Sequence, residues 1–194
     1  MTSRWGPLGW MTLHSISVCY PIEPNAIDRQ LLNEFMDAFG ATITCSICND
    51  HFLRMFRDYR LAVPTWNNSR YDLFIAICKM HNTVNQRLNK PIPKTVGECL
   101  SMLQNATKYS PPREFRKNYI EYLAGQWKHF LGLKQKVDLM RKINQEFWNN
   151  RETEYSSVEF DTTADTTTYP NQPVPEKVIF SKINIRNVRW NPHA

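Results

Sequence analysis

The sequence has 194 residues, of which 42% are hydrophobic and 12% aromatic, so the chain can bury a substantial core and is not broadly disordered. Its formal net charge of +6 is spread along the chain rather than gathered in a basic arm, which gives nucleic-acid binding little support. No apolar run is long enough to span a bilayer, and the first residues lack the pattern of a secretory signal peptide. We therefore expect a protein that stays where it is made, most simply in the cytosol.

Five amphipathic helices are predicted in the first hundred residues, separated by turns that contain proline. Pro7 suits the first turn of a helix that runs to about residue 19 and stops before "YPIEP". A second helix begins near Ala26, a third opens at "CSIC", and a fourth ends near "NKPIP". Thr95, with Glu98 three residues later, has the spacing of a capping box for a short fifth helix. Helices of this length with brief connections predict an all-α core built as a bundle.

The second half of the chain has a different character. The stretch from residue 111 to about 150 is rich in helix formers, with an apolar face of aromatic residues: Tyr119, Tyr122, Trp127, Phe130 and Trp148. "SSVEFDTTADTTTYPNQPVPE" is rich in Thr and Pro and predicts a loop or tether. "KVIFSKINIRNVRW" partly alternates in the manner of a strand. We expect residues 1–105 to form the core domain and residues 106–194 a mainly helical extension.

The five cysteines all lie in the first half, and closely spaced cysteines in a reducing compartment more often bind metal or do redox chemistry than form stable disulfides. Cys45, Cys48, Cys78 and His81 form a C-x2-C and C-x2-H set that would suit tetrahedral zinc, although 29 residues separate the two pairs. On that interpretation the protein is a zinc-stabilised helical interaction module without catalysis.

A redox function is the second interpretation. A cysteine pair at a helix N-terminus is suited to it, because unpaired amides and the helix dipole stabilise a thiolate. A helical protein without the βαβ pattern of thioredoxins needs another electron acceptor, and a flavin takes two electrons. No G-x-G-x-x-G motif is present, so a flavin would lie among helices. A third interpretation makes these cysteines and His81 ordinary core residues, as we expect for Cys19.

Three segments, in order within about residues 4–100, resemble the Erv/ALR family of FAD-linked sulfhydryl oxidases, in particular the short members from large DNA viruses. They are "WGPLGWMTLHSISVCYP", "CSICNDHF" and "SRYDLFIAICKMHNTVNQRLNKP". The resemblance implies a four-helix bundle with a short fifth helix that holds FAD, and a homodimer. It implies an enzyme that forms disulfide bonds in dithiol proteins, here viral ones, and passes the electrons to O2 to give H2O2. It also implies a location at assembly sites in the host cytoplasm, or packaging in the virion.

The resemblance also implies roles for particular residues. Cys45 exchanges disulfides with the incoming dithiol, Cys48 faces the flavin, Cys78 and Cys99 form a structural disulfide, and no metal is bound. The implied cofactor-binding residues are Trp5, Gly6, Trp10, His14, Tyr20, His81, Asn82, Val84, Asn85, Leu88 and Lys90. Two departures stand out. Residues 100–194 contain no cysteine for a shuttle pair, and "SMLQNATKYSPP" lacks the tryptophan-containing tail that the family places after its fifth helix.

Overall fold

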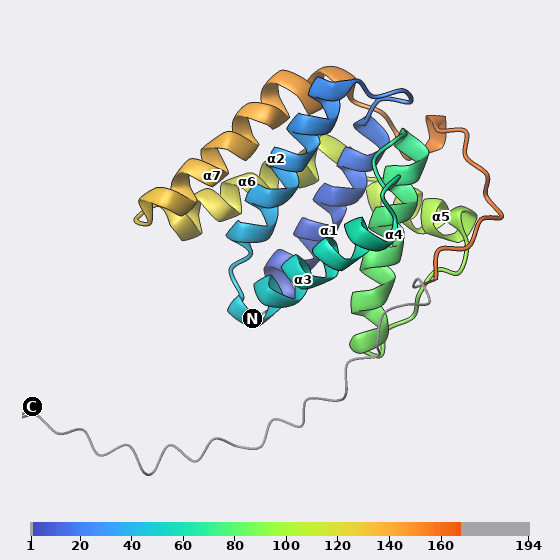
Figure 1. Ribbon diagram of the computed structural model, residues 1–194, viewed down its shortest axis with the longest axis horizontal. Helices are drawn as coiled ribbons and strands as arrows, with labels where there is room; N and C mark the ends of the chain where they lie inside the picture. Colours follow the sequence, from blue (N-terminus) through green and yellow to red (C-terminus); the bar gives the residue numbers. More distant parts are fainter. Residues whose placement is uncertain (1, 168–194) are drawn as a thin grey trace, which may run out of the picture.

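The computed structural model describes residues 2–167, with the backbone alone for residues 2–4, and these residues form an all-helical fold (Figure 1). Its helices are α1 (Thr2–Cys19), α2 (Ala26–Thr42), α3 (Ser46–Ala62), α4 (Arg70–Arg87), α5 (Val96–Thr107), α6 (Pro112–Trp127) and α7 (Leu131–Ile143), followed by a π-helical turn η1 (Asn144–Trp148) and the 3-10 turns η2 (Asn149–Arg151) and η3 (Tyr155–Ser157). The predicted all-α core with a mainly helical extension is confirmed. None of the described helices is long and apolar enough to cross a membrane.

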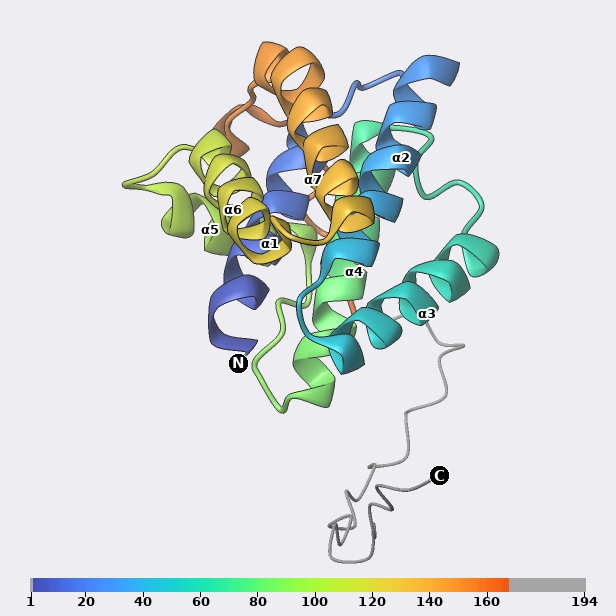
Figure 2. The ribbon, with the colours of Figure 1, turned by 90° about the vertical axis from the view of Figure 1, so that its left-hand side faces the viewer.

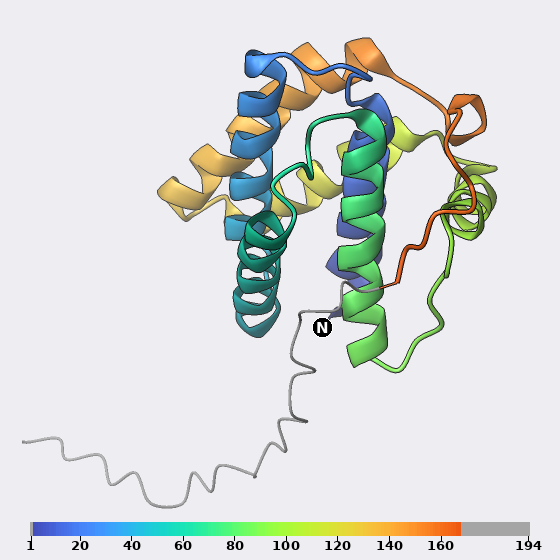
Figure 3. The same cartoon turned by 45° about the vertical axis from the view of Figure 1, so that its right-hand side comes forward.

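Extended structure is confined to one contact in the described part of the chain, an isolated antiparallel bridge between Thr95 and Asp165. It forms where the chain after η3 runs back past α5 toward α4 (Figure 3). The backbone N–H of Val96 donates to Ala164 O at 2.9 Å, and that of Thr166 donates to Lys94 O at 2.9 Å. The strand predicted within residues 177–190 lies outside the described residues.

Local signals set most helix boundaries as predicted. Pro7 is the exception, because α1 already begins at Thr2 and Pro7 lies inside the helix rather than in its first turn. One capping box that was not predicted adds to these signals. Before α2, Asn25 Oδ1 accepts from the Asp28 N–H at 3.0 Å and Asp28 Oδ2 accepts from the Asn25 N–H at 2.9 Å. At α5, Thr95 Oγ1 accepts from the Glu98 N–H at 3.2 Å, which confirms the predicted start. The Glu98 carboxylate, however, accepts from Lys94 N at 2.6 Å rather than from Thr95 N.

The end of α4 is a Schellman motif, and it positions Lys90, which follows the helix. Asn89 takes the left-handed conformation with φ 54°, a role in which asparagine is second to glycine. The N–H of Lys90 donates to Asn85 O at 2.8 Å, and the N–H of Asn89 donates to Gln86 O at 3.0 Å. Pro91 follows and cannot continue the helix, so "NKP" is a complete stop signal.

The core extends through both parts of the chain. Helix α1 packs against α4 on one side and α6 on another, while α7 packs along α2 (Figures 1 and 2). Gly9 on α1 permits a close approach, because a Cβ there would lie 3.3 Å from the Phe39 ring and 3.5 Å from the Tyr119 ring. Buried residues of the extension join the same apolar cluster as the first four helices: Tyr119, Ile120, Leu123, Val137, Met140, Ile143 and Trp148. The division at residue 105 stays a prediction about folding units.

Arg116, fully buried on α6, fastens the extension to α1. Its guanidinium donates to Asn144 Oδ1 at 2.8 Å and to Cys19 Sγ at 3.5 Å, and it forms an ion pair with the Glu152 carboxylate. A buried guanidinium is tolerated only when its donors are used, and these partners come from three different segments. Cys19 is buried, and burial raises the pKa of its thiol, which fits the predicted role as a core residue.

We predict that Arg116→Ala lowers the free energy of unfolding by about 3 kcal/mol, because it leaves the Glu152 carboxylate and Asn144 without their partner. Urea denaturation followed by far-UV circular dichroism measures this loss. Lys117→Ala, an exposed neighbour on the same helix, is the matched control and should change the stability little. Equal effects of the two substitutions would contradict the assigned role of Arg116.

Candidate redox site

The cysteine pair lies at the first turn of α3, where the chain arrives from α2. Cys45 and Cys48 form a disulfide with 5.2 Å between their Cα atoms, and both are partly buried. Cys45 is the N-cap of α3, and its sulfur accepts from the N–H of Cys48 at 3.4 Å. The unpaired amides and positive dipole end of a helix N-terminus favour a thiolate at this position once the bond is reduced. Ile47, between the cysteines, is exposed, so the pair can be approached from solvent.

A cluster of aromatic and imidazole rings lies between α1 and α4. The rings of Trp10 and His81 stack with centroids 4.4 Å apart and planes 6° from parallel. His14 Nε2 and His81 Nδ1 are 3.0 Å apart and share one hydrogen. Phe52, on the same helix as the cysteine pair, meets the edge of Trp10 with ring centroids 6.2 Å apart. The structure therefore brings together three predicted cofactor-binding residues, Trp10, His14 and His81, and joins them to α3 through Phe52.

Both histidines are held neutral. Burial lowers the pKa of His14 well below its usual value, and the neighbouring His81 lowers it further. Burial, together with the positive charge of Lys90, lowers the pKa of His81 to about 4. Only one proton can lie between the two facing nitrogens, so charging both rings would break their hydrogen bond. The remaining nitrogen of His14, Nδ1, is buried without a hydrogen-bond partner among the described residues.

The other predicted cofactor-binding residues divide into two groups. The first group lies near the N-terminus of α1 and at the C-terminal end of α4: Trp5, Gly6, Val84, Asn85, Leu88 and Lys90. There Trp5 Nε1 is buried without a hydrogen-bond partner within the described part of the chain. Asn82 and Tyr20 are used elsewhere. Asn82 Nδ2 donates to Pro93 O at 2.8 Å and Thr166 O at 2.6 Å, and Tyr20 donates to Asn67 O at 3.1 Å from the far end of α1. For these two, contact with a cofactor stays a prediction.

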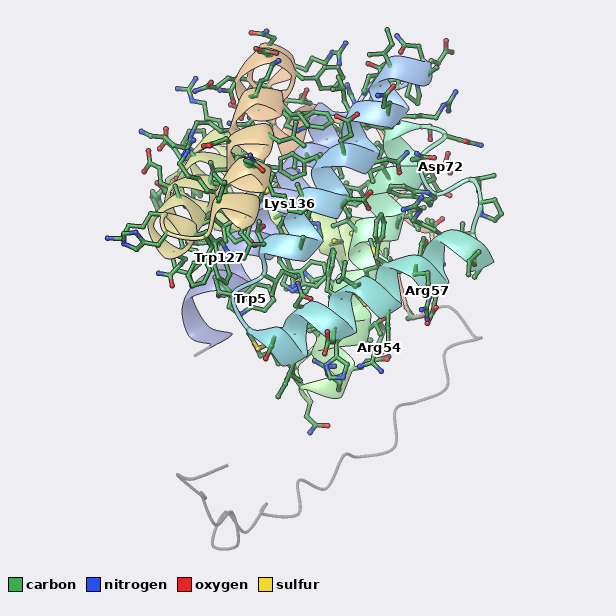
Figure 4. The ribbon with its side chains drawn as sticks, turned by 60° about the vertical axis from the view of Figure 1, so that its left-hand side comes forward. Trp5, Arg54, Arg57, Asp72, Trp127 and Lys136 are labelled. Carbon is green, nitrogen blue, oxygen red and sulfur yellow. A yellow bond between two sulfur atoms is a disulfide. The ribbon has the colours of Figure 1, made fainter. Side chains whose placement is uncertain are left out.

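Positive charge collects beside the ring cluster. Burial lowers the pKa of His51, and the nearby guanidinium groups of Arg87 and Arg54 lower it further. Arg54 projects from the outer face of α3 (Figure 4), whereas Arg57, farther along the same helix, is paired with Asp58. Lys90 follows directly after α4. Aromatic rings, unpartnered buried N–H groups and adjacent cations together suit a ligand that carries both flat rings and phosphates.

The zinc alternative is not favoured, because its ligand set does not assemble. Cys45 and Cys48 are bonded to each other, and among the described residues the group with metal-binding potential is instead His14, Cys78 and Cys99. Those three are buried, with ligand atoms within 4.8 Å of one another. Cys78 and Cys99 are present as thiols, and burial followed by the neighbouring Cys99 raises the pKa of Cys78. The two sulfurs lie together as the predicted pairing requires, but the disulfide stays a prediction.

Two residues of the extension that the sequence analysis did not place at the site contact the loop before the cysteine pair. The hydroxyl oxygens of Tyr122 and Thr44 are 3.1 Å apart, and Trp127 Nε1 donates to Thr42 O at 2.9 Å. Figure 4 shows Trp127 near the end of α2. Both belong to the aromatic face predicted for α6, but periodicity alone could not tell which segment that face covers.

A cysteine pair at a helix N-terminus, beside a cluster of rings in an all-helical fold, is an arrangement suited to thiol–disulfide chemistry that is not built on the thioredoxin plan. Comparison with known proteins makes the class specific. The model of the Erv1/Alr family matches residues 8–105, which is half of the chain. The chain therefore belongs to the Erv1/Alr family.

Individual relatives cover the same part of the chain. A protein of Invertebrate iridescent virus 3 named as a candidate FAD-linked sulfhydryl oxidase is 35% identical over 89 residues, which are 45% of this chain and 57% of that protein. A similarly named protein of Invertebrate iridescent virus 6 is 31% identical over 99 residues, which are 48% of this chain and 87% of that protein. An FAD-linked sulfhydryl oxidase of Oryza sativa subsp. japonica is 32% identical over 87 residues, which are 45% of this chain and 43% of that protein. No solved structure matches.

The neutral histidines make the fold sensitive to acid. The pKa of His81 is about 4 in the folded protein, against an ordinary value of 6.5. The unfolded chain therefore takes up the proton first as the pH falls, and stability present above pH 6.5 is lost toward pH 4. We predict that protonation of His81 alone lowers the free energy of unfolding by about 2.5 kcal/mol between pH 7 and pH 4.5.

Urea denaturation at several pH values measures how steeply the free energy of unfolding changes with pH. His81→Gln should flatten it, whereas His129→Gln, an exposed residue after α6, should leave it as in the wild type. An unchanged slope in His81→Gln would show that His81 is not held neutral.

Proposed function

We propose that this protein is an FAD-linked thiol oxidase that forms disulfide bonds in dithiol substrates. The observation that carries the proposal is the Cys45–Cys48 disulfide at the N-terminus of α3, beside the Trp10, His14 and His81 cluster. The relatives named as FAD-linked sulfhydryl oxidases match the segment that contains both features.

The residues at this end of the bundle suit FAD. Because Trp10 and His81 stack directly on each other, no ring fits between them, and a cofactor would use the surfaces around that stack. The unpartnered Trp5 Nε1 offers a hydrogen-bond donor. Arg87 and Lys90, at the end of α4, offer positive charge for the pyrophosphate. FAD bound there would supply an acceptor for the electron pair of the reduced cysteines.

The thiol chemistry begins at Cys45. A substrate thiolate attacks its Sγ, the bond to Cys48 breaks, and Cys48 leaves as a thiolate. The second thiolate of the substrate then attacks the mixed disulfide, which oxidises the substrate and leaves Cys45 and Cys48 as a dithiol. The helix N-terminus stabilises the negative charge on the released sulfur, and the exposed position of Ile47 leaves the pair open to a protein substrate.

The remaining parts of the electron path follow from the family and stay proposals. O2 is the final acceptor, giving H2O2. Residues 100–194 contain no cysteine and so supply no shuttle pair. A route to Cys45 that fits this is direct attack by the substrate or by a separate dithiol carrier. Viral proteins assembled in the host cytoplasm are the substrates that we expect, since that compartment otherwise keeps thiols reduced.

A homodimer is also a prediction, and the fold limits how it can form. In this chain α6 packs along α1 and α7 along α2, so the faces of α1 and α2 that they cover are not open to a second copy (Figure 2). A dimer would have to use other surfaces. Light scattering coupled to size-exclusion chromatography measures the state directly.

We predict that Cys48→Ser abolishes oxidation of dithiothreitol, measured as oxygen consumption, while the protein keeps its bound flavin. Without Cys48, Cys45 remains a single thiol, so there is no disulfide for the thiolate of dithiothreitol to attack. Cys19→Ser, at a buried position away from the pair, is the control and should retain activity. Sustained turnover by Cys48→Ser would contradict the assigned role of the pair.

A further inference from the structure

We propose that the C-terminal extension positions the redox pair, with Tyr122 and Trp127 on α6 as the positioning residues. This inference rests on the proposed function, since it concerns the same pair of cysteines. It assigns a task to residues beyond the segment that the family model matches, which ends at residue 105.

The contacts converge on residues 42–44, where the chain passes from the last residue of α2 to the cysteine pair. Trp127 Nε1 donates to Thr42 O at 2.9 Å, at the last residue of α2. Two residues later the hydroxyl oxygens of Thr44 and Tyr122 are 3.1 Å apart. Thr44 immediately precedes Cys45, so the second contact lies one residue from the sulfur that receives the substrate.

The opposite side of the loop is held by the bundle core. Ile43 is buried in the main apolar cluster. Thr42 donates through Oγ1 to Ala38 O at 2.8 Å, and Asn49, the residue after Cys48, donates from its amide to Gly40 O. The loop and the first turn of α3 are thus fixed between the C-terminal turn of α2 on one side and α6 on the other.

Helix α6 is itself rigidly placed, so it can act as a support. Tyr119 and Leu123, on the same helix, are fully buried in the shared core. The ring of Trp127 meets Phe130 edge to face with centroids 5.6 Å apart. A hydrogen bond from a rigid helix holds a loop more closely than one from a mobile chain, because less conformational freedom is lost in forming it.

This support matters for the chemistry because Cys45 is the N-cap of α3. Its sulfur gains from the helix amides only while the loop holds it over them. If the loop moves, the reduced pair loses stabilisation and the disulfide becomes relatively more stable. The extension should therefore shift the balance of the pair toward the dithiol, the form that can hand on electrons.

The equilibrium of the pair with glutathione tests this directly. In that reaction two glutathione molecules reduce the Cys45–Cys48 disulfide and become one glutathione disulfide. We expect Tyr122→Phe and Trp127→Phe each to shift the equilibrium toward the protein disulfide by about two- to fivefold. The reduced variants should also react more slowly with iodoacetamide at neutral pH. Cys78 and Cys99 are replaced by serine in all the proteins compared, so that only one pair exchanges.

Tyr119→Phe is the matched control, because it removes a hydroxyl from the same helix that has no hydrogen-bond partner within the described residues. A merely structural contact would destabilise the oxidised and reduced proteins equally and leave the equilibrium with glutathione unmoved. Thr44→Val removes the other side of the Tyr122 contact, and combining it with Tyr122→Phe should add nothing further.

Equilibria for Tyr122→Phe and Trp127→Phe equal to that of Tyr119→Phe would overturn the proposal. The glutathione equilibrium is measured on the protein cysteines and needs neither flavin nor oxygen. A protein that fails as an oxidase but shows the shift would therefore retain this inference, whereas an active oxidase without the shift would lose it.

Discussion

The structure depends on one polar contact within an apolar core, the hydrogen bond between His14 on α1 and His81 on α4. Burial keeps both imidazoles neutral, and the stacking of Trp10 on His81 covers the pair from one side. Because a neutral imidazole can donate from one nitrogen and accept at the other, this contact fixes the relative position of the two helices. It also places the ring cluster on the inner side of α3, the helix that carries the cysteine pair, where a flat cofactor would bind.

The second constraint is that the cysteine pair must be held in place although it lies at an accessible helix N-terminus. A loop and a helix N-terminus are inherently less stable than the middle of a bundle. The chain compensates by packing α6 and α7 onto α1 and α2, so that the loop before Cys45 is flanked by buried residues. The Arg116 network ties the same extension back to α1. The extension is therefore part of the core rather than an appendage to it.

Most of the fold could be predicted because its signals are local. Apolar spacing, Thr95 and the "NKP" stop located most of the five helices close to their observed bounds, whereas Pro7, expected in a first turn, lies inside α1. The cysteine pair and the His14–His81 pair could be identified because three motifs resembled one family in order. Tyr20 and Asn82 matched the same motifs, yet the structure uses their side chains in long-range contacts with Asn67, Pro93 and Thr166. Contacts between residues distant in sequence, such as Tyr122 with Thr44, leave no mark on local periodicity.

The measurement that tests the account most directly is the visible spectrum of the purified protein during an anaerobic titration with dithiothreitol. We predict the yellow absorption of an oxidised flavin, its loss as the dithiol reduces the Cys45–Cys48 pair, and its return when air is admitted. A colourless protein, or a flavin that dithiothreitol leaves oxidised, would contradict the account.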